Sequence, residues 1–225
     1  MPRQPNPQFD PIESPGLVLC EGLDDVAFLV SMLRDIGVSR ELVLIESLDG
    51  RPQLFDRLNG LVLRDSGRRL KALGIICDTD APDDGPASFG RLRDTLRQAG
   101  FSPPTRAGEI SRGRWSDGRN LTIGTYVMPD NVVTGALEDL LLRAVSVSTS
   151  IRCVDDFLEC VSTVDAMTWR PQDRAKARVN AWLASRSDPT LRLQRAFTPQ
   201  LIDPKHQSFD AIKGFLRQLA AAAGT

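Results

Sequence analysis

The sequence has one histidine and one tyrosine, and this scarcity excludes several kinds of catalytic site. His206 lies in DPKHQSF, a composition typical of a surface loop. Serine and cysteine hydrolases place an imidazole beside their nucleophile, and histidine-rich metal sites need several such rings. A single histidine therefore argues strongly against Ser-His-Asp, Cys-His and multi-histidine metal chemistry.

Cysteine pairs and long apolar runs are also missing. The four cysteines form no CxxC motif, so neither a structural zinc site nor a disulfide framework is expected, and Cys20 and Cys77 fall within apolar runs. No apolar run reaches the roughly 18 residues that span a bilayer. Residues 1–15 carry five prolines and no apolar segment, which predicts a loose lead-in rather than a signal peptide, and hence a cytoplasmic location without membrane contact.

A strong net charge is absent as well. The 28 Lys and Arg residues nearly balance the 29 Asp and Glu residues, which leaves a formal net charge of -1. A protein that coats nucleic acid without regard to sequence usually carries an excess of positive charge. Any contact with phosphates must therefore come from a local patch or from bound cations.

Strand and helix patterns alternate over the first part of the chain. Apolar runs predict strands that are separated by segments with helical spacing. Such alternation favours parallel βαβ units, and strands that are apolar throughout favour burial on both faces. We therefore predict an α/β fold with a mainly parallel sheet of about four strands flanked by helices. The expected strands are 17–20, 41–47, 73–77 and 121–129.

The strand patterns stop at about residue 136. The segments 135–145, 154–164, 173–186 and 209–223 all have helical spacing. The sequence thus predicts three parts, which are the lead-in of residues 1–15, an α/β domain over residues 16–135 and a helical C-terminal appendage over residues 136–225 that packs on it.

Acidic residues follow two of the predicted strands. Glu21 ends the first, and Asp78 and Asp80 end the third in the sequence DTD. In open parallel sheets, ligands bind beyond the carboxyl ends of the strands. Carboxylates that crowd together resist joint ionisation, and a hard divalent cation such as Mg²⁺ removes that difficulty without any histidine. The alternative is that DTDAPDDGP forms an acidic solvated turn.

These motifs carry a resemblance to a known family. VLCEGLDDVAF followed by a later strand with DTD resembles the Toprim domain, over about residues 15–130. That family includes topoisomerases, bacterial primases, overcoming-lysogenisation-defect nucleases and the ribonuclease that matures small ribosomal RNA. The resemblance implies a Toprim-like Rossmannoid fold. It also implies that Glu21 is the acid/base or metal-binding glutamate, and that Asp78 and Asp80 bind Mg²⁺ or Mn²⁺.

Further acidic residues are secondary candidates. The resemblance makes Asp25 a candidate for a second metal or a supporting contact, with Asp24 beside it. The alternative is that both simply favour the N-terminal turn of a helix. Glu138, in PDNVVTGALEDLLL, is a further candidate ligand, and this segment resembles small stand-alone Toprim-like bacterial proteins of unknown function.

Basic and aromatic residues supply candidate nucleic-acid contacts. Arg112, Arg114 and Trp115 lie in a polar segment suited to phosphate contact and base stacking, although surface hairpins are often this polar. Lys176 lies on a predicted helix with further basic residues, which is also the pattern of a solvated helix face.

Residue content narrows the chemistry within the family. Topoisomerases cut with a tyrosine, and Tyr126 is predicted within a strand. No GxxxxGK[ST] motif is present, so an ATPase could act only as a partner in trans. Among the activities of the Toprim family, metal-dependent hydrolysis of nucleic-acid phosphodiester bonds is therefore the one we expect. The alternatives are a non-catalytic module that binds nucleic acid, nucleotide or a partner, and, ranked last, a haloacid-dehalogenase-like phosphatase.

Overall fold

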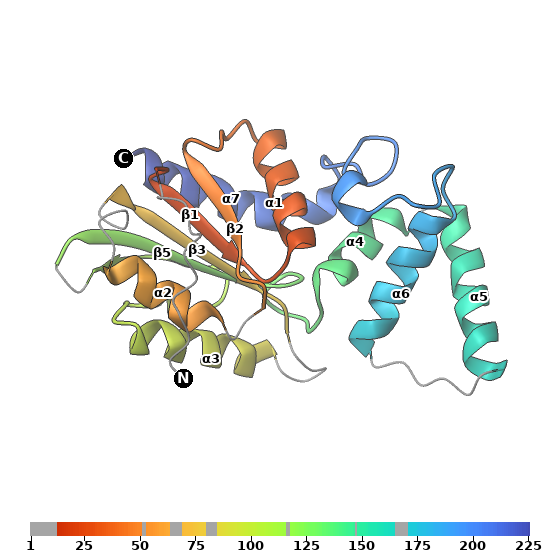
Figure 1. Ribbon diagram of the computed structural model, residues 1–225, viewed down its shortest axis with the longest axis horizontal. Helices are drawn as coiled ribbons and strands as arrows, with labels where there is room; N and C mark the ends of the chain where they lie inside the picture. The colour runs from red at the N-terminus through yellow and green to blue at the C-terminus, as the bar shows by residue number, and fades with distance from the viewer. Residues whose placement is uncertain are drawn as a thin grey trace, which may run out of the picture.

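The computed structural model describes most of the chain as a layered α/β structure (Figure 1). The residues it describes are 13–50, 53–63, 69–79, 85–115, 118–146, 148–164 and 171–225. Asp80, one of the predicted metal ligands, lies outside these ranges.

A five-stranded sheet with the order β2-β1-β3-β5-β4 forms the centre of the structure. All neighbouring strands are parallel except β4 and β5, which are antiparallel. The predicted α/β class and mainly parallel sheet are therefore confirmed, with one strand more than the four expected. The strands are β1 (Gly16–Cys20), β2 (Val43–Ser47), β3 (Ala72–Cys77), β4 (Ile110–Arg114) and β5 (Asn120–Val127).

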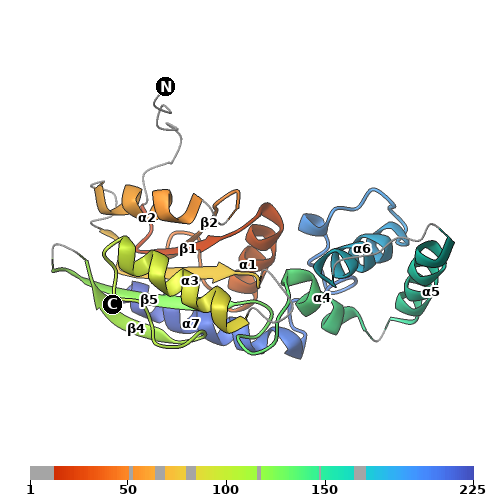
Figure 2. The same ribbon diagram turned by 90° about the horizontal axis from the view of Figure 1, so that it is seen from below.

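Two helices cover one face of the sheet and two cover the other (Figures 1 and 2). The α2/α3 core joins α2 (Leu54–Leu63) and α3 (Gly85–Gln98) to residues such as Leu73 and Ile123 of the sheet. The α1/α7 core joins α1 (Leu23–Asp35) and α7 (Asp210–Gly224) to the opposite side of the same strands. Residues of β1 alternate between the two cores, which explains why this strand is apolar throughout.

Helix α7 returns from the C-terminal third of the chain to the sheet. It contacts β1, β3, β4 and β5. A Cβ atom added to Gly124 would lie 2.8 Å from the Phe215 ring, and one added to Gly74 would lie 2.8 Å from Leu219. Both glycines therefore let the helix lie close against the strands.

Three further helices stand beyond the carboxyl ends of the parallel strands (Figure 1). They are α4 (Leu137–Val145), α5 (Thr149–Val164) and α6 (Pro171–Ala184). Residues of all three belong to the α1/α7 core, so apolar packing continues from the sheet into this group. The domain boundaries near residues 15 and 135 stay predictions. None of the helices within the described ranges is long and apolar enough to cross a bilayer.

Candidate functional site

The strand order places a topological switch point between β1 and β3. The chain leaves β1 through α1 toward β2 on one side, whereas it leaves β3 through α3 toward β4 and β5 on the other. Ligands of open α/β sheets bind where the connections diverge in this way. Glu21 and Asp78 are the first residues after these two strands, so both lie at this point.

A hydrogen bond joins the two segments that carry these acids. The backbone N–H of Asp78 donates to Oε1 of Glu21 at 3.1 Å. The structure thus brings together two predicted site residues that are 57 positions apart in the sequence. The bond also fixes the orientation of the Glu21 carboxylate at the sheet edge.

Asp78 is also anchored to the start of helix α4. Its Oδ1 accepts the backbone N–H of Leu137, the first residue of that helix, at 3.2 Å. The next residue, Thr79, donates its N–H to the carbonyl of Gly135 at 3.0 Å, and its hydroxyl donates to the same carbonyl at 2.8 Å. The edge of β3 and the start of α4 are therefore held together, and the positive end of the α4 dipole faces the Asp78 carboxylate.

Asp25 and Glu138 complete the group of carboxylates. Asp25 lies in the first turn of α1, where its Oδ2 accepts the backbone N–H of Gly22 at 2.8 Å. Glu138 lies in the first turn of α4. We call Glu21, Asp25, Asp78 and Glu138 the acidic group. Two of its members thus come from helix N-termini and two from strand ends.

Burial and the neighbouring charges disfavour ionisation of Asp78 and Asp25. Burial, followed by the charges of Asp25 and Glu21, raises the pKa of Asp78 well above its usual range. Burial also raises the pKa of Asp25, to about 6, and the nearby Glu21 and Glu138 add to the effect. At neutral pH these carboxylates would be stabilised by a proton or by a cation.

Lys176 on α6 provides an opposing charge. Burial raises the pKa of Glu138, and the positive charge of Lys176 partly offsets this rise. The same positive charge opposes, as a smaller effect, the rise in the pKa of Asp78 that burial causes. Lys176 is an exposed residue. Among the predicted nucleic-acid contacts, it is the residue that the structure relates to the carboxylates.

The acidic group has oxygen donors that suit a divalent cation, but its described side chains do not form a complete set of metal ligands. Its oxygen donors are the kind that Mg²⁺ and Mn²⁺ prefer. Within the ranges that the structure describes, however, no three His, Cys, Asp or Glu side chains are arranged so as to hold a metal ion. The predicted ligand Asp80 lies outside those ranges. The donor types thus fit Mg²⁺, while the described side chains do not define its position.

The family assignment rests on most of the chain. The family model described as "Protein of unknown function (DUF3226)" matches residues 15–221. The chain belongs to the DUF3226 family. Comparisons with curated proteins and with solved structures gave no significant match. The matched residues include the four members of the acidic group and the helices α4, α5 and α6.

One hydrogen bond near the acidic group of this DUF3226 chain could not be predicted from the sequence. The side-chain amide of Gln194 donates to Oδ1 of Asp24 at 2.7 Å. Gln194 lies in the short 3-10 helix η3 (Leu193–Arg195), 170 positions from Asp24. Asp24 is thereby tied to this turn. Only the tertiary structure could reveal the pair, because Gln194 belongs to no motif and lies far from Asp24 in the sequence.

Trp115 of the DUF3226 chain packs inside the protein. Its side chain is 4% exposed, and its ring lies 5.3 Å from that of Phe101, centroid to centroid. The Arg119 guanidinium lies 5.2 Å from the Trp115 ring centroid. This placement corrects the expectation that Trp115 stacks on bases, since the ring is already covered within the α2/α3 core.

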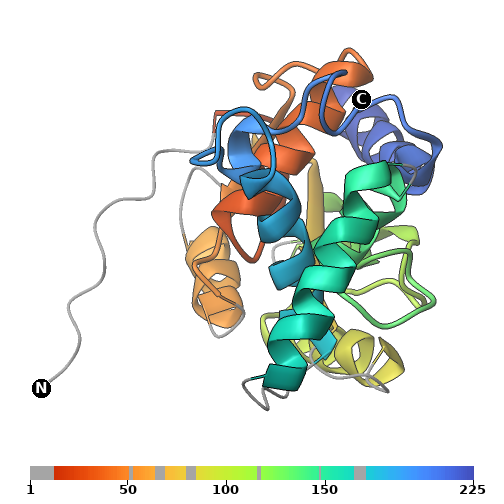
Figure 3. The same ribbon diagram turned by 90° about the vertical axis from the view of Figure 1, so that its right-hand side faces the viewer.

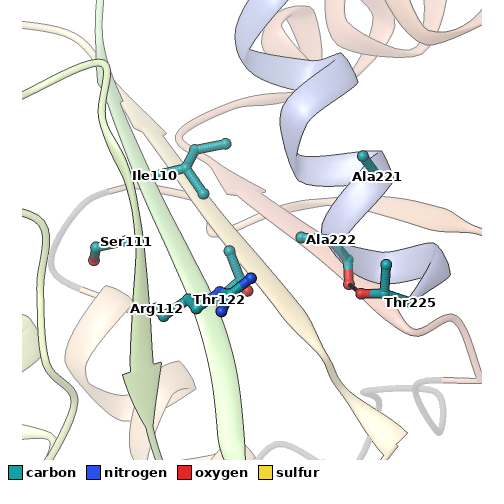
Figure 4. Close-up of a pocket in the computed structure, with 7 residues that line it drawn as sticks. All are labelled: Ile110, Ser111, Arg112, Thr122, Ala221, Ala222 and Thr225. Atoms are coloured by element: carbon teal, nitrogen blue, oxygen red, sulfur yellow. Dashed lines mark hydrogen bonds between the residues drawn. The ribbon is translucent and has the colours of Figure 1, made fainter.

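Arg112 and Arg114 are exposed but lie at the other end of the sheet. They pair with Thr122 and Asn120 near the start of β5, whereas the acidic group lies at the carboxyl ends of the parallel strands. Arg112 instead borders a shallow pocket of about 340 Å³ between the β4–β5 hairpin and the end of α7 (Figure 4). The structure therefore separates these arginines from the predicted metal ligands.

Proposed function

We propose that this protein is a Toprim-like, Mg²⁺-dependent enzyme that hydrolyses phosphodiester bonds of nucleic acid. The observation that supports the proposal is the hydrogen bond that joins Glu21 to Asp78 at the divergence of β1 and β3, where burial disfavours ionisation of Asp78. The motif EGLDD and the later DTD supply the resemblance to Toprim nucleases.

Each residue of the site would have a distinct role. Asp78 and Glu21, with Asp80, would hold Mg²⁺ or Mn²⁺, and Asp25 and Glu138 would support a second ion or its bound waters. The cation would supply charge neutralisation at the phosphate and a lower pKa for the attacking water. Glu21, whose Oε1 accepts the Asp78 N–H, would accept a proton from that water. Lys176 would attract a phosphate oxygen.

The second candidate is a non-catalytic module that binds nucleic acid, nucleotide or a partner through the same edge of the sheet. The lack of a finished three-ligand group among the described side chains favours this candidate. An ATP-dependent form of the hydrolysis would need a partner ATPase in trans, because the sequence contains no GxxxxGK[ST] motif.

Cleavage assays with matched variants test the proposal. DNA and RNA substrates, single- and double-stranded, are incubated with the protein and Mg²⁺ or Mn²⁺. We expect Asp78→Asn and Glu21→Gln to lower the cleavage rate by about 100-fold or more, because each removes a charge that the reaction uses. Asp156→Asn, on the exposed side of α5, is the matched control and should leave the rate unchanged.

Calorimetric titration with Mn²⁺ separates the two candidates. Binding that is lost in Asp78→Asn but retained in Asp156→Asn, together with cleavage, supports the enzyme. Binding to the metal without cleavage of any substrate would favour the non-catalytic module. Cleavage by Asp78→Asn and Glu21→Gln at the parent rate would contradict the proposed site.

A further inference from the structure

Two exposed arginines flank the residue that ties the η3 turn to the start of α1. Gln194 donates to Oδ1 of Asp24 at 2.7 Å, and Arg192 and Arg195 lie on either side of Gln194 in the sequence. We call Arg192 and Arg195 the η3 arginines. Because Asp24 is the chain neighbour of Asp25, the turn borders the acidic group.

The geometry of a 3-10 helix places both arginines on one side of the turn. The backbone N–H of Arg195 donates to the carbonyl of Arg192 at 2.9 Å, and that of Ala196 donates to Leu193 at the same distance. A 3-10 helix has three residues per turn, so side chains three positions apart lie one above the other. Leu193 and Ala196 form the buried side. The η3 arginines therefore share a side that is exposed.

Apolar packing holds this turn against α1. Helix η3 contacts α1, and the ring of Phe197 lies 5.6 Å from that of the buried Phe28, centroid to centroid. The blue segment that joins α6 to α7 lies beside α1 in Figure 1 and in front of it in the end-on view of Figure 3. The position of the η3 arginines is thus set by the α1/α7 core.

Two arginines of the neighbouring helix α6 are already engaged, and the η3 arginines are not. Arg178 donates to both carboxylate oxygens of Asp155, at 2.7 and 3.0 Å, and Arg174 lies 3.7 Å from Glu159. Within the part of the chain that the structure describes, neither guanidinium of the η3 arginines forms an ion pair. These two cations are therefore available to a ligand.

The acid that faces Arg195 is a weak competitor for it. The pKa of Asp188 is lowered by hydrogen bonds from Thr190 and, as a smaller effect, by the charge of Arg195. Its Oδ1 accepts both the N–H and the hydroxyl of Thr190, at 2.9 and 2.6 Å. Charge interactions between exposed groups contribute little in water, so Asp188 leaves the Arg195 guanidinium free to bind a stronger anion.

Phosphate is the anion that this arrangement suits. A guanidinium can donate two parallel hydrogen bonds to one phosphate group. The net charge of the chain is only -1, so a phosphate polymer needs a local cluster of cations beside the acidic group. The η3 arginines on one element and Lys176 on another supply such cations, whereas Arg112 and Arg114 lie at the other end of the sheet.

We propose that the η3 arginines bind the phosphates of a nucleic-acid strand next to the phosphodiester bond that lies at the acidic group. This inference rests on the proposed function and adds to it the surface that positions the strand. The η3 arginines thus take the role that the sequence suggested for Arg112 and Arg114. Their contacts are with the backbone of the strand, so they contribute affinity without base preference.

Fluorescence anisotropy with short labelled single strands of DNA and RNA tests the proposal over a series of KCl concentrations, in EDTA and again in Ca²⁺. We expect Arg192→Gln/Arg195→Gln to weaken binding by about 10-fold or more. The slope of log Kd against log KCl should fall by about 0.7 for each arginine replaced. The charge-matched control is Arg34→Gln/Arg217→Gln, at exposed positions on α1 and α7. It should bind like the parent.

A conservative variant and a cleavage assay make the result decisive. Arg192→Lys/Arg195→Lys keeps both charges and should keep most of the salt dependence. If the glutamine pair matches the parent in affinity and slope, or if the control pair loses as much, the proposal is overturned, and cleavage by the parent would still support the proposed function. Absence of binding by the parent in both conditions would overturn it too. Binding that depends on the η3 arginines, with no cleavage of any substrate, would support this surface and contradict the enzyme.

Discussion

At the residue scale, the site is defined by carboxylates that are costly to ionise together. Asp25 is largely buried and has a pKa of about 6, against an ordinary value of 3.8. Because the folded protein binds this proton more tightly than the unfolded chain, Asp25 stabilises the fold most at low pH. That contribution is lost as the pH rises through about 6.

This linkage predicts how Asp25→Asn changes the stability of the metal-free protein. The amide keeps an oxygen that can accept the Gly22 N–H, but it does not titrate. Between pH 5 and 7.5 we expect the free energy of unfolding of the parent to fall more than that of the variant, by about 1–2 kcal/mol. Urea unfolding at several pH values, in EDTA, measures the difference. Equal slopes for the two proteins would show that Asp25 ionises freely in the fold.

Part of the candidate site could be predicted from the sequence, and part could not. Glu21 and Asp78 were predictable because strands that are apolar throughout indicate a parallel sheet, and parallel strands end at one edge. Gln194 and the N–H of Leu137 were not, because their contacts with Asp24 and Asp78 span 170 and 59 positions without any local pattern.

At the scale of elements, periodicity predicted most helices and strands but missed β4. Its sequence ISRGR is polar, because it is an edge strand that is partly exposed and paired only with β5. Edge strands carry such residues without losing their ladder. The prediction that Trp115 stacks on bases was wrong for a related reason. Side chains alternate in direction along a strand, so the Trp115 ring lies in the α2/α3 core while Arg112 and Arg114 are exposed.

The contact between α7 and the sheet predicts the effect of Gly124→Ala. The new methyl group would meet the Phe215 ring at 2.8 Å and Ile110 at 3.0 Å, so α7 or its side chains must move. We expect a loss of about 1–3 kcal/mol in the free energy of unfolding. Gly60→Ala, inside α2 with nothing within 4 Å of the added atom, is the control and should be neutral or stabilising by up to about 1 kcal/mol. Urea unfolding of both variants measures these values.

A smaller side chain at position 215 sharpens this test. If the clash with Phe215 causes the loss, Phe215→Leu in the Gly124→Ala background should cost less than Phe215→Leu alone. Additive effects of the two substitutions would place the cause elsewhere in the β5 segment.

At the scale of the whole molecule, one apolar core connects the sheet to the helices beyond it. The α1/α7 core includes Val18 and Tyr126 in the sheet, Leu140 in α4 and Trp182 in α6. Trp182 is 3% exposed, and the Arg186 guanidinium lies 4.7 Å from its ring centroid. Because the packing is continuous, loss of these helices would uncover apolar surface of the α1/α7 core, so each part stabilises the other.

This continuity predicts that the chain unfolds in a single calorimetric transition. Trp182→Ala should lower that transition as a whole, since it costs about 3–5 kcal/mol and each kcal/mol shifts the midpoint of a chain of this size by about 2–4 °C. Phe55→Ser, at an exposed position, should shift it by no more than about 2 °C. Two separate transitions in the parent, with Trp182→Ala lowering only one, would show instead that the helices beyond the sheet fold as an independent unit. Such a result would also mean that Lys176 is held near the acidic group by a mobile domain rather than by the continuous core.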